Sequence, residues 1–166
     1  MNTPRIRDRL QPALLDRLRD DEPGLREEPL ERRVLSRAQL REAVLRDLRW
    51  LLNATRATDD TEGLSQARRS VLFYGLPAWS GFTASSLEIP QMEEAIRQAL
   101  LEHEPRMLPH TVQVEALLSD EPMDWHNQLS FRISAQMWAQ PVPLELLLQT
   151  DLDLETGEFE VRDLAR

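Results

Sequence analysis

Apolar residues recur at every third or fourth position in several segments of the first 103 residues, and this spacing predicts amphipathic helices. The first predicted helix runs from residue 6 to about residue 20. The second begins after Ser36, which forms a capping-box pattern with Gln39. One apolar stripe is predicted along this second helix: Leu40, Val44, Leu48, Trp50, Leu51 and Leu52.

Two further helices are predicted before the pattern changes. Residues 67–74 fit a short helix that ends at Gly75. A longer helix has Pro90 in its first turn and ends at about His103, because Pro105 disfavours helical backbone in the residue before it. The face predicted to be buried holds Met92, Ile96, Ala99, Leu100 and His103.

From Thr111 onward apolar and polar residues alternate, which predicts half-buried β-strands. Three strands are expected within residues 112–118, 129–137 and 144–154, and a turn over residues 155–158 leads to a fourth. Helices followed by consecutive strands are typical of an α+β domain. We therefore predict N-terminal helices packed on an antiparallel, meander-like sheet of about four strands.

The first 35 residues differ in composition from the rest of the chain. Residues 20–29 contain two Pro, one Gly and five acidic side chains, which favours an exposed linker. A length of 166 residues fits one folded domain. We predict an arm of helix and loop over residues 1–35 and a single α+β domain over residues 36–166.

The charge is divided unevenly along the chain. Residues 1–69 hold 15 Arg and 13 acidic residues, whereas residues 70–166 hold 5 Arg and 16 acidic residues. An acidic surface repels phosphates and attracts basic proteins, so nucleic acid is not an expected partner. The chain has no stretch of about 20 apolar residues, and its first residues lack the apolar region of a signal peptide. We expect a cytoplasmic protein that does not insert directly into a membrane.

Most of the residue patterns that mark catalytic or metal-binding sites are absent or incomplete in this sequence. It has no Cys and no Lys, which excludes thiolate sites and Schiff-base chemistry. Ser80 lacks the glycines of a nucleophile elbow, and residues 151–157 fit a hairpin better than a calcium loop. Glu102 and Glu104, with acidic residues of 120–124, leave a glycosidase pair as an alternative. Three histidines lack the spacing of a zinc site: His103, His110 and His126.

Glu104, Pro105 and Arg106 form the most informative short motif. Proline restricts the backbone on both sides, so a carboxylate and a guanidinium are presented in a fixed relation just after a helix. One interpretation is a helix stop with solvated charges, and the spacing alone favours it. The other is an interaction site.

Four segments in order resemble the TssE family of type VI secretion baseplate components, within the contractile-phage baseplate wedge family that is sometimes labelled "lysozyme-like". The segments are LLDRL at 14–18, VLRDLRWLLN at 44–53, SVLFYGLP at 70–77 and Glu-Pro-Arg at 104–106. The resemblance implies a non-catalytic structural protein without cofactors, and a fold like the interlocking domain of contractile sheath subunits. It also implies that the protein joins the wedge complex and helps to start sheath polymerisation.

The same resemblance implies the partners and their site. They are wedge proteins of the TssF, TssG and TssK type and contractile sheath subunits, within a baseplate docked to the inner-membrane complex. Glu104, Pro105 and Arg106 are the implied contact with wedge partners, and a sheath strand is expected to extend the sheet. Two alternatives remain at this point: a muramidase-like peptidoglycan hydrolase, and an acidic adaptor for an unrelated basic partner.

Overall fold

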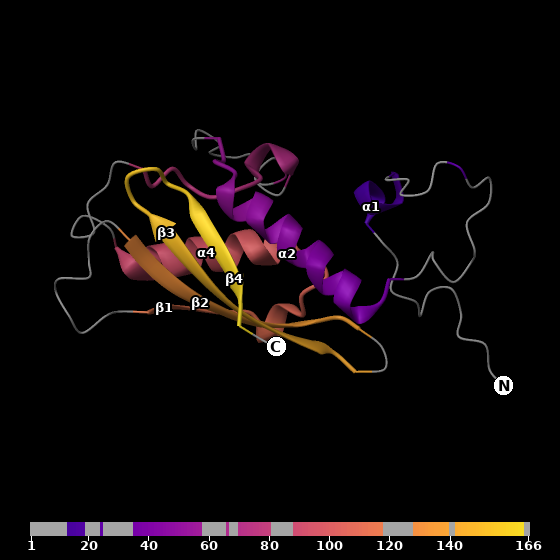
Figure 1. Ribbon diagram of the computed structural model, residues 1–166. Helices are drawn as coiled ribbons and strands as arrows, with labels where there is room; N and C mark the ends of the chain where they lie inside the picture. The colour runs from indigo at the N-terminus through magenta and orange to yellow at the C-terminus, as the bar shows by residue number, and fades with distance from the viewer. Residues whose placement is uncertain are drawn as a thin grey trace.

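The protein is an α+β structure in which helices cover one face of a four-stranded sheet (Figure 1). The computed structural model describes residues 13–18, 24, 35–57, 66, 70–80, 88–117, 128–139 and 142–164. The helical elements are α1 (Leu14–Leu18), α2 (Arg37–Asn53), η3 (Val71–Phe73), α4 (Ile89–His103) and η5 (Pro109–Thr111). The strands are β1 (Gln113–Leu117), β2 (Gln128–Met137), β3 (Leu144–Asp153) and β4 (Phe159–Asp163).

The start of α2 is fixed by the predicted capping box. The Ser36 side chain accepts from the Gln39 N–H at 3.2 Å, and the Gln39 side chain accepts from the Ser36 N–H at 2.9 Å. The predicted stripe is buried except for Trp50, which is 51% exposed. The prediction for Trp50 was wrong because a helix turns about 100° per residue, which rotates this position away from Leu48 and Leu52.

Ser36→Ala is expected to lower the free energy of unfolding by about 1 kcal/mol, because an N–H in the first turn of α2 loses its acceptor. Urea unfolding at constant m-value measures this loss. Gln39→Ala is the matched control, since it leaves the Ser36 hydroxyl in place and should cost less. A Ser36→Ala chain as stable as wild type contradicts the prediction.

The other predicted helices are described to different extents. α4 has Pro90 in its first turn and ends at His103, as predicted, and its apolar face is buried apart from the half-buried His103. Of the predicted helix over residues 67–74, the 3₁₀ turn η3 is described and residues 67–69 lie outside the described residues. Of the predicted helix over residues 6–20, α1 is described. None of the helices in the described residues is long and apolar enough to span a membrane.

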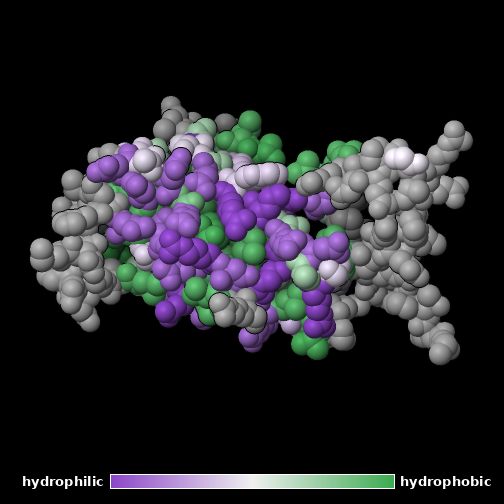
Figure 2. Space-filling model, in the orientation of Figure 1, coloured by the Kyte–Doolittle hydropathy of each residue, from purple (hydrophilic) through white to green (hydrophobic). Residues whose placement is uncertain are grey.

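The sheet is an antiparallel meander with strand order β1-β2-β3-β4, which confirms the predicted four-stranded meander. β2 and β3 pair over ten residues each, whereas β1 and β4 contribute five each at the two edges. One face packs on α2 and α4 and forms the core. Figure 2 shows the opposite face, on which hydrophilic side chains predominate. The core-facing side chains of the two central strands include Leu129, Phe131, Ile133, Met137, Leu146, Leu148 and Leu152.

The predicted domain boundary at residue 35 stays a prediction. Leu35 packs against the core just before α2. α1 lies on the other side of that boundary and is tied to α2 by an ion pair between Asp16 and Arg46.

Thr150 interrupts the apolar face of β3. It is fully buried, and its hydroxyl has no hydrogen-bond partner among the described residues. Thr150→Val is therefore expected to raise the free energy of unfolding by about 1 kcal/mol, because it removes an unsatisfied polar group. Thr111→Val is the matched opposite case, since that hydroxyl donates to Leu108 O at 2.7 Å and accepts from Gln136 N at 2.9 Å. Thermal unfolding of both variants tests the contrast, and a destabilised Thr150→Val chain would contradict it.

Candidate functional site

Glu104 and Arg106 are bonded to each other immediately after α4. Glu104 is the C-terminal cap of α4, and its N–H donates to Leu100 O at 2.9 Å. The Arg106 guanidinium donates to both carboxylate oxygens, through Nε to Oε1 at 2.6 Å and Nη2 to Oε2 at 2.5 Å. The Arg106 backbone N–H adds a third bond to Oε1 at 3.1 Å. Because Glu104 is only 3% exposed, its charge faces Arg106 and not solvent.

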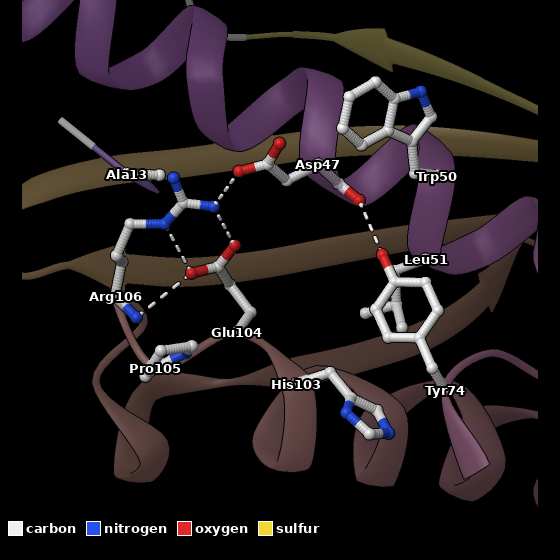
Figure 3. Close-up of a pocket in the computed structure, with 9 residues that line it drawn as sticks. All are labelled: Ala13, Asp47, Trp50, Leu51, Tyr74, His103, Glu104, Pro105 and Arg106. Carbon is white, nitrogen blue, oxygen red and sulfur yellow. Dashed lines mark hydrogen bonds and ion pairs between the residues drawn. The ribbon is translucent and has the colours of Figure 1, made fainter. Parts of the chain in front are cut away.

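Asp47 of α2 links this pair to the rest of the molecule (Figure 3). Its Oδ2 accepts from Arg106 Nη2 at 2.7 Å, and its Oδ1 accepts from Arg46 Nε at 2.9 Å and Nη2 at 2.8 Å. Arg46 in turn pairs with Asp16 of α1. We call Glu104, Arg106, Asp47, Arg46 and Asp16 the ionic chain. It joins the end of α4 to α2 and α1 through alternating charges.

The charges of the ionic chain shift the pKa values of several groups. Burial alone would lower the pKa of Arg106, but the hydrogen bonds and negative charges of Glu104 and Asp47 outweigh it and raise that pKa. The Arg46 hydrogen bond lowers the pKa of Asp16. Burial, followed by the charges of Asp47 and Glu104, raises the pKa of the nearby Tyr74 hydroxyl. Arg106 and Asp16 are therefore held in their charged forms at neutral pH.

A pocket of about 460 Å³ opens beside the ionic chain (Figure 3). Pro105 is exposed at its wall, and the Arg106 side chain keeps 25% of its surface exposed. Tyr74 and His103 meet edge to face, with ring centroids 5.2 Å apart. The pocket thus combines aromatic walls with carboxylates that are already paired to Arg106. Its lining residues are Ala13, Asp47, Trp50, Leu51, Tyr74, His103, Glu104, Pro105 and Arg106.

The other sequence candidates that the structure describes do not assemble into a site. Ser80 and Glu102 are exposed, His110 lies on the surface in η5, and His126 and residues 120–124 lie outside the described residues. Residues 151–157 form the predicted hairpin: Asp153 accepts from two turn N–H groups, and Gly157 has a φ of +77°. Within the described parts of the chain, no group of three or more His, Asp or Glu side chains is arranged to hold a metal ion.

Sequence reasoning found the motif but missed its internal partners. Glu42 and Arg46 are four positions apart on α2, a spacing at which opposite charges can pair, yet Arg46 bonds to Asp16 and Asp47. Asp47 and Asp16 both lie in segments that carry the resemblance, LLDRL and VLRDLRWLLN. Their place in these segments was the only signal in the sequence that Asp16 and Asp47 belong to the site. The sequence alone does not show which of its many carboxylates contacts Arg106.

Comparison with known proteins gives one match. The model of a family described as baseplate wedge protein gp25 matches residues 38–142. The matched region begins within α2 and includes Asp47, η3, α4 and the motif at 104–106. No curated protein and no solved structure matched the chain significantly.

Proposed function

Because the chain belongs to the family of baseplate wedge protein gp25, we propose that it is the TssE-type baseplate component of a type VI secretion machine. In this role it joins the wedge complex and helps to start sheath polymerisation, and its sheet serves as an interlocking domain for sheath subunits. The match over residues 38–142 carries the proposal, since membership of this family implies a structural role and contacts with other baseplate components. The four ordered segments that resemble TssE support a type VI secretion machine in particular.

The proposed partners are wedge proteins of the TssF, TssG and TssK type, together with contractile sheath subunits. The proposed location is the cytoplasm, within a baseplate docked to the inner-membrane complex. The excess of acidic residues after residue 69 supports partners with basic surfaces.

Within this proposal, Glu104, Pro105 and Arg106 act together at the wedge contact but in different ways. The exposed Pro105 ring and the exposed part of Arg106 meet the partner beside the pocket. Glu104 is a positioning residue, because its buried carboxylate holds the guanidinium from behind. Trp50 on the rim adds a large side chain of the kind that anchors interfaces.

Co-purification with the wedge proteins of the same secretion cluster tests the proposal. Trp50→Ala is expected to weaken the complex by about 2 kcal/mol, roughly 30-fold, because it truncates an anchor without touching the hydrogen bonds of Arg106. Trp138→Ala is the control, since Trp138 has similar exposure but does not line the pocket. Equal binding by both variants would show that the pocket is not part of the interface. A wild-type chain that binds no wedge protein would overturn the TssE-type role itself.

No observation favours a peptidoglycan hydrolase. A glycosidase acid requires a carboxyl group in an apolar setting, whereas Glu104 accepts three hydrogen bonds from Arg106. We therefore propose that the protein is not an enzyme. The acidic-adaptor alternative predicts binding that depends on salt but not on the pocket, so the same Trp50 comparison distinguishes it.

A further inference from the structure

The pocket beside the ionic chain has walls of two kinds, and together they indicate which kind of side chain it accepts. Figure 3 shows the charged groups of Glu104 and Arg106 to one side and aromatic rings to the other, with Asp47 between them. The rings belong to Trp50, Tyr74 and His103. A volume of about 460 Å³ lies in the range of pockets that hold small molecules, so a long side chain of a partner fits inside.

The charge of the pocket walls is negative in sum. The carboxylates of Asp47 and Glu104 outnumber the one guanidinium in the lining by two to one. Arg106 already donates to both of them, through Nε and Nη2, at 2.5 to 2.7 Å. The ionic chain as a whole has the same excess, with three carboxylates and two guanidinium groups. One negative charge is therefore left without an internal counter-charge.

The Tyr74 hydroxyl shows the effect of this excess inside the pocket. Its pKa is raised first by burial and then by the negative charges of Asp47 and Glu104. Negative charges that disfavour a phenolate favour a cation in the same place. The Tyr74 oxygen can also accept a hydrogen bond, since its own contact with the Asp47 carbonyl is long, at 3.5 Å.

The aromatic walls favour a cation as well. Because the face of an aromatic ring is negative, it attracts a cation and repels a carboxylate. Trp50 already interacts with one guanidinium in this way, since Arg46 Cζ lies 5.2 Å from its ring centroid. Trp50 is nevertheless 51% exposed, and Tyr74 is half-buried, so both rings keep free surface for a second cation.

We propose that the pocket accepts a basic side chain of the wedge partner, an arginine or a lysine, whose cationic group lies against Trp50 and Tyr74 and close to Asp47. This inference rests on the proposed function, since it names the chemistry of the partner at that contact. A partner carboxylate aimed at Arg106 would meet the two carboxylates that already hold the guanidinium. An apolar side chain would leave the excess negative charge of the pocket unpaired.

A charge series at Ala13 tests the inference with the purified wedge proteins of the same cluster. Ala13 lines the pocket, is half-buried and is not a member of the ionic chain. Ala13→Gln is the size-matched neutral reference for Ala13→Glu and Ala13→Arg. We expect Ala13→Glu to bind about fivefold more tightly than this reference and Ala13→Arg about fivefold more weakly. Circular dichroism checks that all three variants are folded.

Two results of the series would overturn the inference. The reverse order of affinities would show that the partner inserts a carboxylate. Equal affinities of the three variants would show that the occupant is uncharged. Both results leave the TssE-type role intact, because the wedge proteins still bind. Trp50→Ala does not make this distinction, since it shows whether the pocket is used but not which side chain fills it.

A small probe, N-acetylargininamide, tests the same chemistry without a wedge protein. The indole N–H signal of Trp50 in the NMR spectrum of the full chain is expected to shift as the probe is added, while that of Trp138 stays in place. The glutamine and glutamate analogues of the probe should leave both signals unchanged. An equal response of Trp50 to all three compounds, or none to the arginine compound, would overturn the inference. If the wild-type chain binds no wedge protein, the proposed function fails, and this probe still decides whether the pocket accepts a cation.

Discussion

Replacing Arg106 with alanine is expected to lower the free energy of unfolding by about 3 kcal/mol or more, because the buried Glu104 carboxylate loses its partner. The variant loses the two guanidinium bonds to Glu104 and the one to Asp47, and keeps only the backbone N–H bond to Glu104. Chemical unfolding monitored by circular dichroism measures the loss. An interface-only role for Arg106 predicts instead a variant as stable as wild type.

Two further variants show whether the cost comes from the unpaired charge. Arg162→Ala removes a guanidinium that is 51% exposed, and it should cost clearly less even though Arg162 pairs with Asp151. A double variant, Glu104→Met with Arg106→Met, should be more stable than Arg106→Ala, because no buried charge is left uncompensated. If the double variant is the less stable of the two, packing and not charge explains the loss.

Gly75→Ala is expected to be similarly damaging, with a loss of about 3 kcal/mol or more. Gly75 has a φ of +112°, which side chains rarely allow, and an added Cβ would lie 2.1 Å from the carbonyl oxygen of Ala54. That carbonyl accepts the Leu76 N–H at 2.8 Å, and Arg56 N–H donates back to Leu76 O at 2.9 Å. The methyl group therefore forces apart the bridge that ties the chain after α2 to the chain after η3.

Glycines elsewhere provide graded controls for this prediction. A Cβ added at Gly24 would meet no atom within 4 Å, so Gly24→Ala should leave the thermal midpoint unchanged. Gly157 also has a positive φ, but its added Cβ would lie 3.2 Å from the Ser80 side chain. Gly157→Ala should therefore lower the thermal midpoint more than Gly24→Ala and less than Gly75→Ala. A Gly75→Ala chain with the thermal midpoint of wild type would contradict the prediction, because it would show that the bridge adjusts to the methyl group at little cost in free energy.

Local patterns in the sequence predicted most of the fold. The capping box of α2, the proline at the start of α4 and the alternation in the strands each act over a few residues, so each is visible in a short window. Trp50 shows the limit, since it is apolar and adjacent to a buried stripe yet faces solvent at the pocket rim. Hydrophobicity alone does not distinguish a core residue from a surface anchor.

The site was predictable as a motif but not as a network. Glu104 and Arg106 are two positions apart, so their pairing follows from the local backbone. Arg106 and Asp47 are 59 positions apart, and Asp16 and Arg46 are 30 apart. These contacts arise only when α1, α2 and the end of α4 converge. With 29 acidic residues in the chain, no spacing rule selects the two that meet the arginines.

Asp47 divides its two oxygens between arginines that serve different neighbours. Oδ2 is engaged by Arg106 at the pocket, and Oδ1 by Arg46, which also holds Asp16 of α1. In the proposed wedge complex, a partner that draws Arg106 away from Asp47 would change the charge around Arg46, and through Arg46 the ion pair with Asp16 of α1. Reciprocity of binding free energies then requires that a change in the docking of α1 alter the affinity for that proposed partner by the same amount.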